Sequence, residues 1–197
     1  MNSITFFNIL KKNKKSTYVE CLIKTKVNEV VSDRIVLFGS RNIYIKLSDA
    51  TGVRICSGHK KTIKKICKIQ SILNEHGLAP RLFFCDIFEI LILNSEIKRI
   101  VKNFRKKITK VYCLFQEHIH PVRLYDYKNE KYSTVFVNFR KKVREISTSY
   151  GFKDWDLKKG NILISENGPR CIDFDEWKIT NKCLFNKISF KPEKISI

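Results

Sequence analysis

The sequence predicts an α+β fold in which a strand-rich first half precedes a long helix and a polar β-hairpin. Three observations support this prediction. Residues 33–57 alternate apolar and polar side chains, as consecutive strands do. Residues 60–76 and 132–150 carry apolar side chains at helical spacing. Residues 154–175 place polar side chains at the ends of two short apolar runs.

The first predicted strands lie between residues 33 and 57. The run RIVLFGS ends at Gly39-Ser40, which is a turn signal, and NIYIKLS then alternates apolar and polar residues. The segment 49–52, Asp-Ala-Thr-Gly, is a turn into a third strand, VRICS. We therefore expect three consecutive strands here.

A helix is expected from Lys60 to His76, because apolar residues recur on one side of it and lysines crowd the other. Gly77 is a natural C-terminal stop for this helix. The remaining elements follow in order: one or two buried strands in 82–93, a basic helical segment in 96–110, a strand in 111–119, a second amphipathic helix in 132–150, and hairpin strands in 162–164 and 170–172.

The composition describes a folded and strongly basic protein. Of the 197 residues, 43% are hydrophobic, which is enough for a core, and the formal net charge is +20. The excess of positive charge favours an anionic partner, such as nucleotide phosphates, nucleic acid, a phosphorylated acceptor or an acidic membrane surface. The alternative is that the lysines only keep the protein soluble.

The cysteines and the apolar runs indicate a soluble, cytoplasmic protein. The seven cysteines are scattered without a CxxC pair, which argues against a zinc site or a disulfide framework. The most apolar stretch, 82–93, is interrupted by Asp86 and Glu89 and is too short to span a bilayer. The N-terminus is a poor signal peptide, because its positive charge follows the apolar run.

The strongest functional signal is DWDLKKGNILI at 154–164, followed by CIDFD at 171–175. Phosphoryl transfer needs a group that accepts the proton of the attacking hydroxyl, and oxygen ligands that fix magnesium on the triphosphate. Asp156 would be the proton acceptor, and Asn161 and Asp173 the magnesium ligands. Lys158 would neutralise the transferred phosphoryl group.

A simpler interpretation of this hairpin is that its Asp and Asn residues only cap turns on the surface. A single D-x-x-x-x-N match would favour that interpretation. Here two motifs occur together, each with strand character, which favours the catalytic interpretation.

The two motifs resemble the protein-kinase-like superfamily, in its small-molecule branch of choline/ethanolamine kinases and aminoglycoside phosphotransferases. Those enzymes carry an H-x-D-x-x-x-x-N-I-L loop and an I-D-F-E or I-D-F-D strand. The resemblance implies a single two-lobed domain over residues 1–197, with a strand-rich N-lobe at about 30–116 and a reduced helical C-lobe at about 117–197. It also implies ATP and Mg²⁺ as cofactors and a hydroxyl group as the phosphate acceptor.

The resemblance also suggests ATP-binding residues in the first half. VRICSG resembles the strand that holds the phosphate-binding cation, which points to Arg54. Lys46 is a rival for that role, or else an exposed strand lysine. Ser40 lies where the phosphate-covering loop belongs, and Glu117 and His118 would line the adenine pocket.

The sequence also departs from this family. Asp154 replaces the usual His, the glycine-rich loop is absent, and Gln70 and Glu75 are imperfect substitutes for the Glu that pairs with the strand cation. The short tail after Asp175 leaves the acceptor unidentified, so protein and small-molecule acceptors both stay open. A nucleotide-binding pseudokinase, or a basic nucleic-acid-binding scaffold, is the alternative function, and the oligomeric state is open.

Overall fold

The computed structural model describes residues 1–12, 17–26, 28–38, 42–100, 108–121, 130–154 and 157–187. The chain forms two compact units. Unit 1 contains Met1–Ile63 and Phe83–His118, and unit 2 contains Lys64–Leu82 and Ile119–Lys191. The barrel and the hairpin described below therefore lie in different units.

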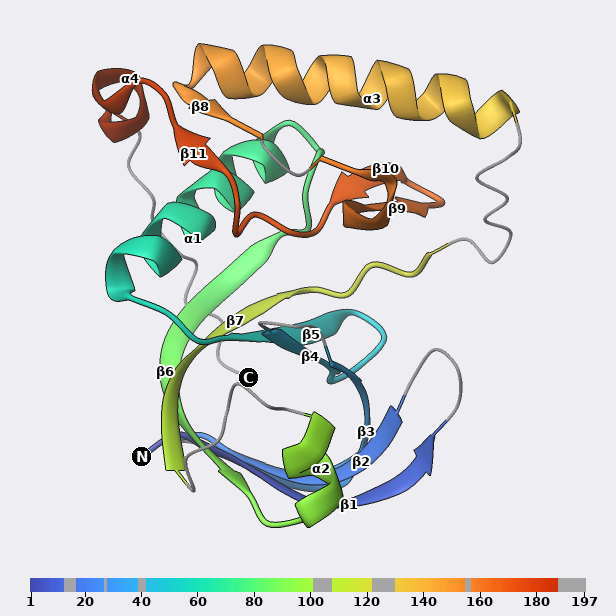
Figure 1. Cartoon of the computed structure of the whole chain (residues 1–197), viewed down its shortest axis with the longest axis vertical. Helices are drawn as coiled ribbons and strands as arrows, with labels where there is room; N and C mark the ends of the chain where they lie inside the picture. Colours follow the sequence, from blue (N-terminus) through green and yellow to red (C-terminus); the bar gives the residue numbers. More distant parts are fainter. Residues whose placement is uncertain are drawn as a thin grey trace. The chain divides into compact units, whose positions relative to one another are not determined.

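Seven strands form a closed barrel (Figure 1). Their order around the barrel is β1-β2-β3-β4-β5-β7-β6. The strands are β1 (Ser3–Lys12), β2 (Thr17–Lys24), β3 (Glu29–Phe38), β4 (Asn42–Lys46), β5 (Thr51–Cys56), β6 (Leu82–Ile92) and β7 (Ile108–Glu117).

The first strand closes the barrel. β1 pairs with β2 in antiparallel fashion, with Ser3 opposite Lys24, and with β6 in parallel fashion, with Ser3 opposite Glu89. Since β1 has a neighbour on both sides, closure removes the sheet edges that an open sheet would expose. The inward face of the barrel is a continuous apolar core that includes Phe6 and Phe115.

The predicted protein-kinase-like fold, with its two-lobed α+β architecture, is wrong. Unit 1 is a closed seven-stranded barrel, and the described residues contain only four α-helices. The sequence did not predict β1 and β2, and these strands complete the barrel. The register of β1 shifts between Phe6 and Asn8 and between Ile9 and Lys11, so its side chains do not keep the strict alternation that identifies a strand.

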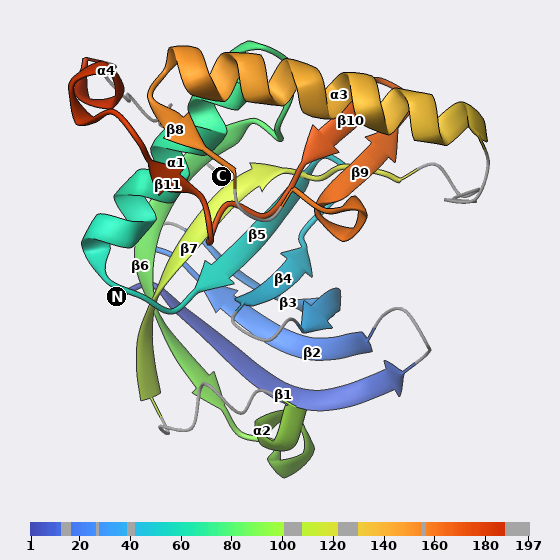
Figure 2. The same ribbon diagram turned by 45° about the horizontal axis from the view of Figure 1, so that its top comes forward.

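Unit 2 combines helices with two small two-stranded sheets (Figure 2). β9 pairs with β10, and β8 pairs with β11. Phe152, Phe174 and Trp177 are almost fully buried, and the Trp177 ring lies 5.9 Å from that of Phe152 and 5.5 Å from that of Phe174. The elements are α1 (Lys60–Glu75), α3 (Glu130–Ser149), β8 (Phe152–Lys153), the 3₁₀ turn η1 (Lys159–Asn161), β9 (Ile162–Ser165), β10 (Gly168–Cys171), β11 (Lys178–Ile179) and α4 (Lys182–Asn186).

Many of the individual predicted elements are confirmed. The strands between 33 and 57, the helix at 60–76 and the helix at 132–150 correspond to β3 to β5, α1 and α3. Gly77 ends α1 with a φ of 67°, a conformation that glycine adopts without steric cost.

The predicted helix at 96–110 is confirmed at its start and wrong at its end. Residues 96–100 belong to α2 (Ser95–Ile100), residues 101–107 lie outside the described part, and β7 begins at Ile108. None of the described helices is both long and apolar enough to cross a membrane.

Candidate functional site

The open end of the β9–β10 hairpin brings the two predicted magnesium ligands close together. Asn161 directly precedes β9, and Asp173 follows β10 by two residues. Ile162 lies opposite Cys171, and one step further the Ile172 N–H donates to the Asn161 carbonyl over 3.1 Å. Asp173 is therefore the residue that follows the backbone partner of Asn161, just beyond the open end of the hairpin.

A short turn holds the Asp173 carboxylate in place. Its Oδ1 accepts a hydrogen bond from the Asp175 N–H at 3.3 Å, and the Asp173 carbonyl accepts one from the Trp177 indole at 3.1 Å. Trp177 is fully buried, while Asp173 is half-buried. The carboxylate thus lies next to a rigid core residue and keeps some access to solvent.

Lys65 of α1 binds the same turn. Its Nζ donates to the carbonyl oxygens of Asp175 at 3.1 Å and Trp177 at 2.6 Å. Burial lowers the pKa of Lys65, and the charges of Asp175 and Glu176 oppose that change. Sequence reasoning missed this residue, because it is one of several lysines that the helical pattern assigns to the solvent face.

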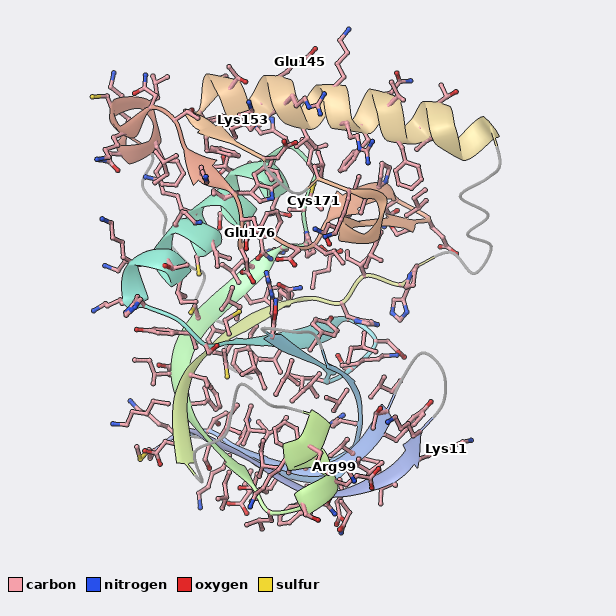
Figure 3. The ribbon with its side chains drawn as sticks, in the orientation of Figure 1. Lys11, Arg99, Glu145, Lys153, Cys171 and Glu176 are labelled. Atoms are coloured by element: carbon pink, nitrogen blue, oxygen red, sulfur yellow. The ribbon has the colours of Figure 1, made fainter. Side chains whose placement is uncertain are left out.

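Asp154, at the position where the family has His, is mostly buried. Its side chain is 10% exposed, and its Oδ2 lies 4.0 Å from Nε of Arg144 on α3. Cys171, labelled in Figure 3, is fully buried at the end of β10. Burial and the charge of Asp154 both raise the pKa of the Cys171 thiol. Asp154 is therefore a mostly buried carboxylate near α3 whose Oδ2 accepts no hydrogen bond from the described residues.

Of the two predicted catalytic residues, Asp156 and Lys158, the structure describes only Lys158. Asp156 lies outside the described residues. Lys158 is exposed, and its carbonyl accepts a hydrogen bond from the Asn161 N–H at 3.0 Å. This bond forms the turn that leads into β9, so Lys158 and Asn161 are held close together by the backbone.

The two rival cations of unit 1 have different surroundings. Lys46 forms an ion pair with Asp49 at 2.5 Å, and the Asp49 side chain is 89% exposed. Arg54 is only 4% exposed on β5, where it lies opposite Tyr44 of β4 and Leu114 of β7. Lys46 is therefore held in a surface ion pair with Asp49, whereas the Arg54 side chain is buried away from solvent. Ser40, the third predicted phosphate-binding residue, lies outside the described part of the chain.

The predicted adenine-pocket residues lie at the end of β7. Glu117 pairs with Thr51 in the barrel register. His118 accepts or donates a 2.8 Å hydrogen bond through Nδ1 with the Tyr44 hydroxyl, and the two rings stack with their centroids 5.8 Å apart. Burial raises the pKa of the Tyr44 hydroxyl. His118 is thus fixed by an aromatic neighbour that sequence reasoning did not identify.

A dedicated metal cage is absent from the described residues, where His, Cys, Asp and Glu form no group of three or more that could hold an ion. Asp156 is not part of that description. Magnesium keeps several waters and binds substrate phosphates, so one carboxylate and one amide from the protein suffice for a nucleotide-bound ion. Asn161 and Asp173 offer one amide and one carboxylate at the open end of the hairpin.

Comparison with known proteins provides no family for the chain. No protein-family model matches the sequence, and no curated protein matches it. Because folds host many functions, a functional conclusion must come from the site itself.

Proposed function

We propose that this protein is an ATP- and Mg²⁺-dependent phosphotransferase that acts on a hydroxyl group. The observation that supports this most is the position of Asn161 and Asp173 at the open end of the β9–β10 hairpin, where the N–H of Ile172, the residue before Asp173, donates to the Asn161 carbonyl. In this proposal the two side chains hold magnesium on the nucleotide phosphates, and the metal neutralises charge that develops during transfer.

The residues before the hairpin supply the other groups. Asp156 orients the acceptor hydroxyl and takes its proton, as a carboxylate near a nucleophile can. Lys158 is exposed at the start of the turn that ends at Asn161, so its side chain reaches solvent and lies three residues from one of the two ligands. It stabilises the charge on the transferred phosphoryl group.

The first test measures ATP turnover by the purified full chain with magnesium and with the metal chelated. The proposal predicts ADP formation that requires magnesium. Radiolabelled ATP incubated with separate protein, lipid and sugar fractions would then identify the acceptor class, because label transfers only to the correct fraction. Equal, background-level ADP formation under both conditions would contradict the proposal.

The net charge of +20 supports a second candidate, a basic scaffold that binds nucleic acid, or a protein that binds nucleotide without turning it over. Thermal unfolding separates these functions. Stabilisation by ATP that requires magnesium supports the phosphotransferase. Stabilisation by RNA, with none from ATP under either condition, supports the scaffold.

A further inference from the structure

The barrel of unit 1 contains a cavity of about 330 Å³ that the proposed phosphotransferase chemistry does not use. It lies where β2 and β4 end and β6 begins. Its apolar wall includes Ile23, Leu47, Phe84 and Phe115. Phe84 and Phe115 stack with their ring centroids 4.2 Å apart and their planes 12° apart. These rings form a flat, preformed apolar surface.

A single basic side chain, Arg34 of β3, lines this cavity. Arg34 lies opposite Val19 and two residues before Val36, both of which are buried inside the barrel. Since side chains alternate along a strand, Arg34 is on the inward face. Its Nη1 donates to the Leu47 carbonyl, which fixes the direction of the guanidinium group.

The Nε of Arg34 is buried and has no hydrogen-bond partner among the residues that the structure describes. No carboxylate of the described chain forms an ion pair with this guanidinium. A buried charged donor without a partner is costly, and proteins seldom retain one without a ligand or counterion. The unsatisfied Nε of Arg34 therefore indicates that the cavity receives an anion.

A second donor lies at the same cavity. The Ser48 Oγ accepts hydrogen bonds from the Ala50 N–H at 3.2 Å and the Thr51 N–H at 3.0 Å. Both bonds use the oxygen as an acceptor, so the hydroxyl proton can be donated to a ligand. The cavity thus combines one cation and the Ser48 hydroxyl, along with the polar residues Thr25, Asn28 and Thr51, with a mainly apolar wall.

We propose that the barrel cavity binds a small amphipathic monocarboxylate. Its carboxylate accepts hydrogen bonds from Arg34 and Ser48, and its apolar body packs on Phe84 and Phe115. A planar guanidinium matches a carboxylate in shape and charge. Among the described residues, Arg34 alone is a basic residue that lines the cavity, which suits a single negative charge better than a phosphate dianion.

The cavity size limits the ligand to a small molecule. A volume of about 330 Å³ is at the lower end of known ligand sites, and barrels of about eight strands can hold one small ligand. Octanoate is a suitable probe, and octanamide is its neutral counterpart of the same shape.

The test is calorimetric titration of the full chain with octanoate and with octanamide. The proposal predicts one octanoate per chain and at least a tenfold weaker affinity for the amide. Arg34→Met should weaken octanoate binding at least tenfold. Arg99→Met, which removes an exposed arginine of the same unit, should leave it unchanged (Figure 3).

The titrations would overturn the proposal if they showed no saturable binding of octanoate, equal affinities for octanoate and octanamide, or unchanged octanoate binding in the Arg34 variant. The comparison of octanoate with octanamide uses the parent protein. It therefore tests whether the ligand's negative charge is needed for binding even if the Arg34 variant fails to fold. Binding that disappears at high salt would also contradict the proposal, since that behaviour belongs to exposed charges.

Discussion

The Ile172 N–H donates a hydrogen bond to the Asn161 carbonyl over 3.1 Å, one step beyond the last pair of the β9–β10 ladder. This bond keeps the two hairpin strands together at the point where Asn161 and Asp173 leave them. The spacing of the two candidate ligands is thus determined locally. It depends on the hairpin of unit 2 and not on the barrel of unit 1.

Replacing Lys65 should destabilise the turn that follows Asp173. In Lys65→Met, the carbonyl oxygens of Asp175 and Trp177 lose a charged donor. Hydrogen bonds to charged groups contribute about 1.5–3 kcal/mol each, but both bonds come from one partly exposed ammonium group, so we expect the free energy of unfolding to fall by about 2–3 kcal/mol, less than the sum. Urea denaturation measures this change, and hydrogen exchange should increase in residues 174–178.

The neighbouring lysine provides the control. Lys64 is exposed on the same helix, so Lys64→Met should change the free energy of unfolding by no more than about 0.5 kcal/mol. Equal destabilisation by the two variants would show that the contacts of Lys65 are not what stabilises the turn.

Gly52→Ala should destabilise unit 1. A Cβ atom at this position would lie 1.9 Å from the Tyr44 hydroxyl oxygen, so the ring must move and lose its contact with His118. We expect a loss of about 1–3 kcal/mol in the free energy of unfolding, typical of overpacking. Gly58→Ala, where the nearest atom is 4.0 Å from the added Cβ, is the matched control.

A double-mutant cycle tests the cause. In a Tyr44→Ala background the ring that would collide with the added Cβ is gone. Gly52→Ala should therefore lower the free energy of unfolding much less there than in the parent. The same cost in both backgrounds would mean that strain elsewhere, and not the Tyr44 ring, explains the loss.

Stability should fall at high pH because of Cys21. Burial raises the pKa of this thiol from 9.0 to about 11, with Arg34 lowering it and Asp33 raising it further. As pH rises, the Cys21 thiol therefore loses its proton in the unfolded chain before it does so in the folded protein. The free energy of unfolding decreases as pH rises from 9 to 11. The contribution is up to about 3 kcal/mol.

Comparing variants isolates this contribution. Cys21→Ala should show a shallower loss of stability between pH 9 and 11 than the parent, measured by urea denaturation under reducing conditions. Cys183→Ala should keep the parent slope, because Cys183 is exposed. Identical slopes in all three proteins would contradict the assignment.

The sequence predicted the local elements better than their assembly. α1 and α3 were predictable, because apolar side chains recur at helical spacing and Gly77 marks a stop. The barrel was not predictable from those patterns. Its closure depends on the pairing of β1 with β6, a contact distant in sequence, and register shifts in β1 obscure its alternation.

The candidate site was predictable where it depends on one hairpin, and not where it depends on distant contacts. Asn161 and Asp173 were identified from a motif whose strands are adjacent in the chain. Lys65 and Tyr44 were missed, because their partners, Trp177 and His118, lie far away in sequence. The spacing of residues along the chain does not predict contacts between residues so far apart in sequence.

The measurement that tests the central claim most directly is magnesium-dependent ATP turnover by Asp173→Asn. The amide oxygen can still accept the Asp175 N–H, so the turn is kept, but the negative charge that holds magnesium is lost. Glu166→Gln makes the same chemical change at the exposed turn of the hairpin. We predict that Asp173→Asn lowers kcat about 100-fold, with an unchanged Tm, while Glu166→Gln keeps the parent rate. Equal turnover by the parent protein and Asp173→Asn would contradict the account.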